Sequence, residues 1–262
     1  IPYIKPKLQV KEGDVVQVGS PIFFDKTDPR IQFLSPGSGR VAAINYGPKR
    51  IIDSVVIDCG PDFRQQMLYN SINRLDAILF THEHADHTAG LDDIRPFFFR
   101  QGDISIYALD RVIENLTQRF GYILNSADKY PGAPSVQVHS VDPTTTFDLC
   151  QQSIIPVLGK HHQLTVLGYR LGSFAYLTDI KTIADEERHK LAGLDLLVLN
   201  ALREEPHHSH LNLAEAIDLA HLIGAKNTYF THISHHLGFH AEVEQKLPKS
   251  VHLAYDNLSI II

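Results

Sequence analysis

The stretch Thr81-His82-Glu83-His84-Ala85-Asp86-His87 decides the fold, because it gathers four candidate metal ligands directly behind an apolar run. That run, Ala77 to Phe80, predicts a short buried strand. A loop after such a strand is held at the rim of a core, and two histidines spaced two apart in an extended segment point the same way. Asp86 and His87 fall where a helical pattern begins at Thr88. The heptapeptide can therefore serve two metal ions, the alternative being a polar loop with surface histidines.

Length and composition predict an ordinary globular protein. The 262 residues, 44% of them hydrophobic, suit one large domain or one domain plus a small module. No apolar run approaches the roughly 18 residues of a membrane span, and the N-terminus lacks a secretory pattern, so we expect no membrane span and a cytoplasmic location. Cys59 and Cys150 are too few for a disulfide framework or a cysteine zinc site, and we expect both to be buried thiols.

Charge divides the chain unevenly. Residues 1–50 carry 8 Lys and Arg against 4 Asp and Glu, a net charge of +4. Residues 51–262 carry a net charge of −10, so the whole chain has a net charge of −6. The acidic part lacks the basic footprint of proteins that follow a long nucleic-acid backbone, so such a partner is not expected. Sixteen histidines are the other unusual feature, and most of them are clustered.

The first 50 residues predict an all-β segment, since short β-runs alternate with glycine turns from Lys7 to Phe24 and again from Ser35 to Ile44. This segment resembles the barrel-sandwich module of biotinyl and lipoyl carrier domains, and most of all the N-terminal region of the A subunit of the sodium-pumping NADH:quinone oxidoreductase. Lys26 stands where carriers hold a modified lysine, but the hairpin is short, and we predict an exposed turn lysine. Residues 31–34 and 41–44 are hypothesised to lead into the following sandwich; a separate module and a foreign fusion are the alternatives.

Residues 51–262 predict an α/β domain in which strands and helices alternate. Asn212 followed by Glu215 predicts a capping box for one helix. The expected strands are 50–60, 75–80, 104–108, 136–141, 145–149, 153–158, 164–171, 173–177, 194–200, 227–230, 251–255 and 258–262. The expected helices are 62–70, 86–100 with an interruption at Pro96, 110–120, 185–191, 213–223 and 241–247.

Further ligand types follow other predicted strands. His161 and His162 come after the strand ending at Leu158, Asp179 follows residues 173–177, and His232 follows residues 227–230. Because strand ends on one edge of a sandwich converge, these side chains are expected to approach the heptapeptide.

The ordered motifs of residues 51–262 resemble those of metallo-β-lactamase-fold hydrolases. The nearest resemblance is to the branch holding the cyclic-phosphate phosphodiesterase of the carbon-phosphorus lyase pathway, with the transfer-RNA 3′-processing endonucleases as cousins. It implies a four-layer αββα sandwich. The motifs are Ile57-Asp58-Cys59-Gly60-Pro61-Asp62-Phe63, the heptapeptide, Gly168-Tyr169-Arg170, Tyr176-Leu177-Thr178-Asp179, Ser209-His210 and Thr231-His232-Ile233-Ser234-His235.

The resemblance also implies a dinuclear metal centre. The first metal would be held by His82, His84 and His161, with His161 preferred to His162 by its distance to Leu164. The second would be held by Asp86, His87 and His232, and Asp179 would bridge both. Imidazole and carboxylate ligands suit two divalent ions, zinc first, with manganese or iron as alternatives.

Three residues receive roles beyond the metal shell. Asp58 is expected to orient a ligand histidine, the alternative being a carboxylate that caps a turn. His210 corresponds to the residue that protonates or stabilises the departing alkoxide in phosphodiesterases, and it is the predicted catalytic acid beside Asp179 and Asp86. His235 is expected either to contact substrate phosphate or to buttress His232. Solvated loop positions are expected for His207, His208, His236 and His240.

These features predict a metal-dependent phosphodiesterase that cleaves a small, cyclic or linear phosphodiester through a metal-bridging hydroxide. Thioester, lactone or β-lactam hydrolysis on the same fold is the alternative, as is transfer-RNA 3′-end processing. The alternative from another class is a non-catalytic metal-binding module or a fragment of a respiratory-complex subunit. The sequence leaves open whether the chain is a monomer or a homodimer.

Overall fold

The computed structural model describes residues 6–11, 13–25, 29–34, 38–40, 54–125 and 129–261. The chain divides into two compact units, residues 1–51 and residues 52–262. Among the described residues, no helix combines the length and the apolar character needed to cross a membrane. The cytoplasmic location stays a prediction.

The regular secondary structure among the described residues of the N-terminal unit consists of strands. β3 (Pro21–Asp25) pairs antiparallel with β1 (Pro6–Leu8) and with β4 (Gln32–Leu34), while β2 (Val15–Val16) pairs with β5 (Gly39–Arg40). The β3–β4 pairing corrects one hypothesis, because it uses residues 32–34 inside this unit instead of as a leading strand of the sandwich. Residues 41–44 and the predicted turn lysine, Lys26, lie outside the described residues.

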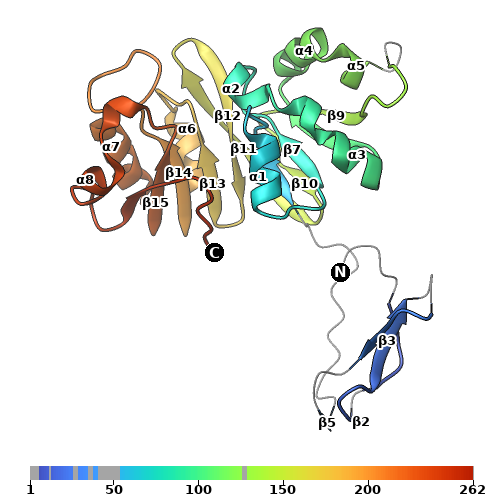
Figure 1. Cartoon of the computed structure of the whole chain (residues 1–262). Coiled ribbons are helices and arrows are strands. Elements are labelled where there is room, and N and C mark those ends of the chain that lie inside the picture. The colour runs from blue at the N-terminus through green and yellow to red at the C-terminus, as the bar shows by residue number, and fades with distance from the viewer. Residues whose placement is uncertain are drawn as a thin grey trace. The chain divides into compact units, whose positions relative to one another are not determined.

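The first sheet of the larger unit is parallel throughout (Figure 1). Its order is β6 (Val55–Ile57), β7 (Ala77–Leu79), β8 (Ile104–Ala108) and β9 (Val136–Ser140). A parallel neighbour requires a crossover connection, and helices supply it here. They are α1 (Phe63–Tyr69), α2 (Ala85–Thr88), the 3-10 helix η1 (Leu91–Ile94), α3 (Arg95–Gln101), α4 (Asp110–Arg119) and α5 (Gly121–Leu124).

The second sheet is mixed. Its antiparallel part is β10 (Phe147–Leu149), β11 (Gln152–His161), β12 (Leu164–Leu171) and β13 (Phe174–Leu177), and its parallel part continues through β14 (Leu196–Asn200), β15 (Asn227–Thr231) and β16 (Val251–Leu253). The connecting helices are α6 (Asp185–Arg188), η3 (His189–Leu191), α7 (Leu213–Ile223), η4 (His235–Leu237) and α8 (His240–Glu244). The predicted capping box is confirmed, since Asn212 Oδ1 accepts from Glu215 N at 2.9 Å and Glu215 Oε2 accepts from Asn212 N at 2.9 Å.

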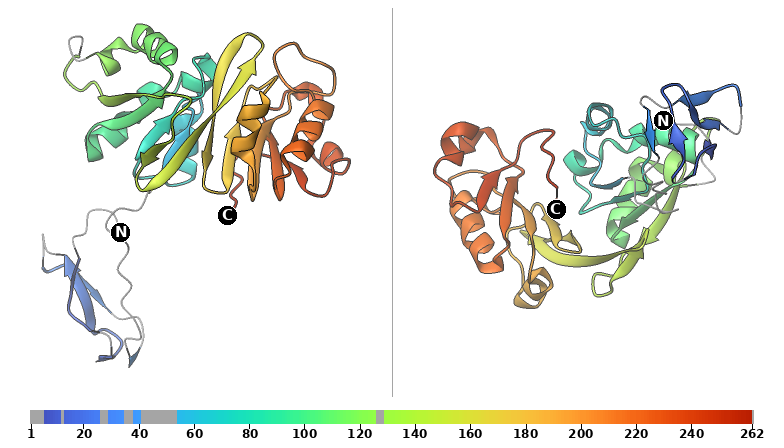
Figure 2. Two further views of the ribbon diagram at one scale, coloured as in Figure 1. Left: turned by 180° about the vertical axis from the view of Figure 1, so that it is seen from behind. Right: turned by 90° about the horizontal axis from the view of Figure 1, so that it is seen from below.

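Strand periodicity explains why the two sheets stack with helices outside both. In β7, Ala77 and Leu79 enter the core between the sheets, whereas Ile78 enters the core beneath the helices. Tyr169 from β12 is fully buried between the sheets and donates a 2.7 Å hydrogen bond to Phe80 O. Figure 2 shows helices α1 to α5 on one outer side and α6 to α8 on the other. The predicted four-layer αββα sandwich is therefore confirmed.

Several local expectations were wrong. The helix expected over residues 86–100 is three short helices. The interruption expected at Pro96 is present, since α3 begins at Arg95, but a further break lies at Gly90, whose amide donates to Cys59 O at 2.8 Å and where a Cβ would lie 2.1 Å from Gly60 O. β11 continues to His161 because it pairs with β12 up to Leu164. Residues 258–261 form no strand in the described chain. Cys59 is buried as expected, but Cys150 is exposed, because it lies in the tight turn that joins β10 to β11.

Candidate metal centre

The candidate ligands gather where strands end. The heptapeptide follows β7, His161 ends β11, Asp179 follows β13, and His232 follows β15. Asp179 and His232 both have a φ of 54°, and Asp58, behind β6, has a φ of 61°. This left-handed conformation is uncommon for side chains with a Cβ and marks positions that the surrounding structure enforces.

His82, His84 and His161 form one side of the cluster. His82 Nε2 lies 3.0 Å from His84 Nδ1, and the His161 ring centroid lies 5.2 Å from that of His84. His82 Nδ1 faces Thr81 Oγ1 at 2.9 Å, and His161 Nδ1 donates to Ser209 O at 3.0 Å. Because these outer nitrogens hold the protons, both Nε2 atoms offer lone pairs to the cluster.

Asp86, His87 and His232 form the other side. Asp86 Oδ2 lies 3.3 Å from His87 Nε2 and 3.5 Å from His232 Nε2. His87 is oriented from behind, since its Nδ1 donates to Asp58 Oδ2 at 2.7 Å. Asp58 is fixed in turn by the Thr81 amide and hydroxyl, which donate to its two oxygens at 2.8 Å each. The structure therefore places Asp58 behind a candidate ligand, as predicted for an orienting residue.

Asp179 lies between the two sides. Its Oδ2 is 3.0 Å from His87 Nε2, and its Oδ1 is 3.2 Å from His232 Nε2 and 2.7 Å from His210 Nε2. The side chain is only 2% exposed, so this carboxylate faces the histidines and not water. Asp179 has the position expected of a bridging group.

The charges of these groups suit cations. Burial and the neighbouring His87 lower the pKa of His82 to about 3, which keeps its lone pair available. Burial opposes ionisation of Asp179, but its contacts with His210 and His87 outweigh burial and hold the pKa of that carboxyl well below its usual range. Burial also opposes a charged His87, yet contacts with Asp179, Asp58 and Asp86 outweigh it and raise the pKa of His87 to about 12. The ionised carboxylates therefore favour positive charge at this point, which either a protonated His87 or a bound cation would supply.

The donor set fits divalent metal ions. Three groups of ligand atoms each lie within 4.8 Å of one another: His82 with His87 and Asp179, Asp86 with His87 and His232, and His161 with Asp179 and His210. His87 Nε2 is buried beside two carboxylates and yet makes no well-aligned hydrogen bond to a described residue. An imidazole nitrogen and carboxylate oxygens that converge without such a bond are the arrangement that a zinc-like ion satisfies.

The sequence did not predict one residue that contacts the candidate site. His207 was expected in a solvated loop, but its Nδ1 lies 3.1 Å from Nδ1 of His210, whose side chain is 12% exposed. The spacing of three residues gives no periodic signal outside a helix, so only the fold could reveal this contact. The ring of His208 lies between those of His207 and His162, at 4.5 Å and 5.8 Å between centroids.

The structure does not bring His235 into the cluster. His235 is exposed in η4, where its ring lies 3.8 Å from that of His236 between centroids, and within the described chain it makes no hydrogen bond or ion pair with the candidate ligands. The alternative contact of His235 with His232 has no counterpart among the described residues, and its predicted contact with substrate phosphate stays a prediction.

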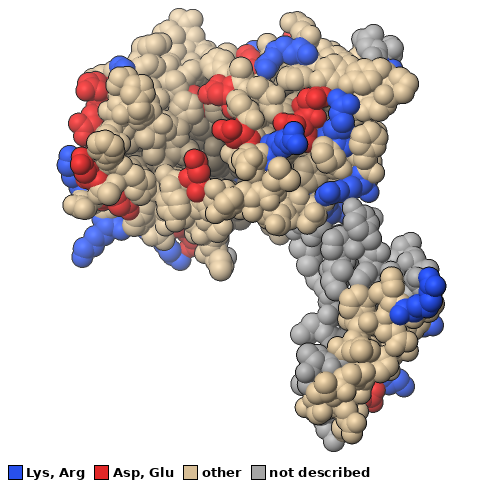
Figure 3. Space-filling model, in the orientation of Figure 1, with Lys and Arg blue, Asp and Glu red and all other residues tan. Residues whose placement is uncertain are grey.

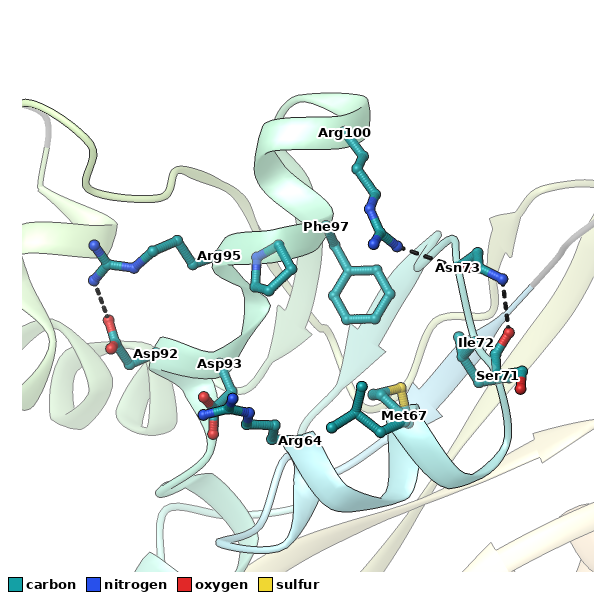
Figure 4. Close-up of a pocket in the computed structure, with 12 residues that line it drawn as sticks. Arg64, Met67, Ser71, Ile72, Asn73, Asp92, Asp93, Arg95, Phe97 and Arg100 are labelled. Carbon is teal, nitrogen blue, oxygen red and sulfur yellow. Dashed lines mark hydrogen bonds and ion pairs between the residues drawn. The ribbon is translucent and has the colours of Figure 1, made fainter. Parts of the chain in front are cut away.

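A groove lies apart from the candidate ligands. This hollow of about 680 Å³ between α1 and α3 is lined by Arg64, Met67, Phe97 and neighbouring residues (Figure 4). Arg95 in this groove pairs with Asp92 at 2.9 Å, and Arg100 donates to Asn73 Oδ1 at 3.3 Å. Because the groove holds none of the convergent ligands, we place the chemistry at the His/Asp cluster.

Comparison with known proteins fixes the family. The Beta-lactamase superfamily domain matches residues 53–233, which is more than half of the chain, and the chain therefore belongs to the beta-lactamase superfamily. The NqrA N-terminal barrel-sandwich hybrid domain matches residues 1–60. The superfamily resemblance predicted from the motifs is thus confirmed, its relatives are hydrolases, and the fold implies divalent metal ions.

Individual relatives are similar over one part of the chain each. A crystal structure described as a new diphosphatase from the PhnP family is 40% identical, with a TM-score of 0.73 and coverage of 79% of both chains. An octanoyltransferase of Porphyromonas gingivalis is 39% identical over 79% of this chain, which spans 42% of that protein. The A subunit of the Na(+)-translocating NADH-quinone reductase of Histophilus somni is 52% identical over 21% of this chain, which spans 12% of that relative.

Proposed function

We propose that this chain is a dinuclear metal-dependent phosphodiesterase acting on a small phosphodiester, with His210 as the general acid. The observation that carries the proposal is the contact of His210 Nε2 with Asp179 Oδ1 at 2.7 Å, which places an imidazole beside the predicted bridging carboxylate. An alkoxide is a poor leaving group, and a positioned acid typically supplies about 10² to 10⁴ in rate.

The residues divide the work as follows. His82, His84 and His161 would hold one ion, Asp86, His87 and His232 the other, and Asp179 both. The bound ions would activate water as a nucleophile and neutralise charge on the phosphoryl oxygens. Asp58 keeps His87 in one ring orientation through the 2.7 Å hydrogen bond, and the buried Thr81 keeps Asp58 in place. His210 would deliver its Nε2 proton to the departing oxygen.

A small substrate is favoured by charge. Residues 51–262 carry a net charge of −10, and on the face shown in Figure 3 acidic side chains lie near the middle of the larger unit, while most Lys and Arg side chains lie toward its edges. A long polyanion gains affinity from an extended run of basic side chains, which this face of the described unit does not offer. The similarity to a diphosphatase supports hydrolysis at phosphorus, and a cyclic ribose or nucleoside phosphate is the proposed substrate class.

Acyl hydrolysis is the second candidate, because one relative is named an octanoyltransferase. That name does not assign acyl transfer to the shared segment, since this chain spans only 42% of that protein. A thioester has a good leaving group and gains little from an acid at His210.

The deciding experiment assays the metal-loaded chain and the His210→Ala variant on 2′,3′-cyclic AMP, on bis(p-nitrophenyl) phosphate and on an octanoyl thioester. We expect turnover of both phosphodiesters and a loss of about 10² to 10⁴ in the variant on cyclic AMP alone, because p-nitrophenolate needs no proton to depart. Metal content measured in parallel should be unchanged, whereas loss of an ion would make His210 a ligand. Turnover of the thioester alone would replace the proposal by acyl hydrolysis, and no turnover with bound metal would favour a non-catalytic module.

A further inference from the structure

The ring of His210 is held at both nitrogens. Its Nε2 lies 2.7 Å from Asp179 Oδ1, and its Nδ1 lies 3.1 Å from His207 Nδ1 and 3.1 Å from Ser209 Oγ. A ring fixed at one nitrogen can still rotate about that contact, whereas a ring fixed at both has one orientation. The contact with Asp179 alone therefore does not account for how the His210 ring is positioned.

Two donors besides His210 face Nδ1 of His207. The backbone amide of Ser209, which can only donate, lies 3.4 Å from this nitrogen, and the Ser209 hydroxyl lies 3.3 Å from it. We therefore assign His207 Nδ1 as the acceptor and His210 Nδ1 as the donor of the 3.1 Å contact. Burial and the nearby His210 lower the pKa of His207, which is consistent with a neutral acceptor.

This hydrogen bond decides which nitrogen of His210 can react. With Nδ1 held by the contact with His207, the ring presents Nε2 to the cluster, and Nε2 is the atom that lies 2.7 Å from Asp179 Oδ1. A carboxylate that accepts from the far nitrogen of a catalytic histidine acts in the same way in serine proteases, where it fixes the tautomer and stabilises the imidazolium.

We propose that His207 is a positioning residue for leaving-group protonation, which holds His210 by accepting its Nδ1 proton so that Nε2 serves as the acid. This inference rests on the proposed function, because it needs His210 to be the acid. The same short loop positions a candidate ligand too, since Ser209 O accepts from His161 Nδ1. Residues 207–210 thus connect the acid and the metal centre through adjacent residues.

The test compares two substitutions at one position. His207→Leu removes the acceptor at similar volume, whereas His207→Asn keeps an oxygen near the place of Nδ1. His221→Leu is the matched control, because this exposed histidine of α7 contacts neither His207 nor His210 in the described structure. Each full-length variant is loaded with zinc, checked for unchanged metal content, and assayed on 2′,3′-cyclic AMP and on bis(p-nitrophenyl) phosphate.

We expect His207→Leu to lower kcat on cyclic AMP about 10- to 100-fold with little change in KM, as for other residues that orient a functional histidine. On bis(p-nitrophenyl) phosphate the loss should be less than about threefold, because p-nitrophenolate departs without an acid. His207→Asn should recover most of the rate, and His221→Leu should resemble the wild type.

A second measurement does not depend on turnover. In ¹⁵N-histidine spectra, the signal that is lost in His210→Ala should show a protonated Nδ1 in the wild type and should shift toward the Nε2-protonated tautomer in His207→Leu. An unchanged tautomer in that variant would overturn the inference, as would equal losses on both substrates. If His210→Ala loses activity on cyclic AMP and His207→Leu does not, the inference alone fails; if His210→Ala loses nothing there, the proposed function fails with it.

Discussion

The heptapeptide and residues 207–210 lie at one centre, but they reach it by different means. The heptapeptide is delivered by local structure, because β7 ends at Leu79 and α2 begins at Ala85. Residues 207–210 adjoin no strand, and long-range bonds hold their surroundings: Leu211 N donates to Ile180 O at 3.1 Å, and Leu202 N to Leu211 O at 3.0 Å. The difference teaches that ligands carried by strand ends can be inferred from sequence, whereas groups that act on other side chains depend on tertiary packing.

The largest loss of metal binding and activity is expected from a substitution at Asp179, which contacts both His87 of the heptapeptide and His210. The Asp179→Asn substitution keeps the size of the side chain but removes the charge that faces His87, His210 and His232. We expect loss of bound metal and turnover no higher than that of the chelator-treated chain. Metal quantification and phosphodiester assays measure this, with Asp142→Asn, which binds only its own turn, as the control. Two equivalents of metal and normal turnover in Asp179→Asn would contradict a bridging role.

Metal binding by Asp86, His87 and His232 can be weakened separately by a substitution at Asp58, which binds His87. In Asp58→Asn, an amide nitrogen replaces one of the oxygens that bind His87 and Thr81, so His87 loses its fixed orientation. Metal affinity should fall about 10- to 100-fold, as is usual when a residue behind a ligand is changed. Competition with a chelating dye measures it, and Asp62→Asn, an exposed carboxylate that makes no cap hydrogen bond, serves as the control. Unchanged affinity would leave Asp58 as a turn cap only.

Metal binding should release protons. The pKa of His87 is raised to about 12, so His87 is charged in the metal-free chain at neutral pH, and the pKa of His232 is raised above the ordinary 6.5. Below pH 6.5 the ion pairs of both histidines contribute fully to the stability of the metal-free fold, and this contribution is lost as pH rises through their raised folded-state pKa values. Because a metal must displace the proton of His87, we expect about one proton or more to be released and affinity to increase with pH. Calorimetry in buffers of different ionisation enthalpy gives the count, and zero release would refute the charge assignment.

The smallest effect concerns how α7 supports residues 207–210. Asn212→Ala removes the 2.9 Å bond to Glu215 N and should lower the free energy of unfolding by about 1 kcal/mol. Asp218→Ala, on the exposed face of the same helix, should change it by less than about 0.5 kcal/mol. Chemical denaturation measures both. Equal effects would show that the capping box adds nothing to the stability of this helix.

Most of the sandwich followed from periodicity, because each strand has to bury alternate faces. Residues 164–171 and 213–223 form the expected strand and helix with the expected bounds. Periodicity could not show that Gly90 approaches Gly60 O and breaks the helix expected over 86–100, since that contact joins two separate loops. Cys150 was placed wrongly for a related reason: an apolar residue type does not reveal that it sits in an exposed turn.

By itself, the sequence determined the alternation of strands and helices, the heptapeptide and the candidate ligands at later strand ends, because strand length and side-chain period are local properties. Only the tertiary structure decided that Asp179 lies between both sides of the cluster, that His235 lies outside it, and that His207 binds His210. Those facts depend on how strand ends turn and on which loops meet across two sheets. No spacing within one segment encodes them.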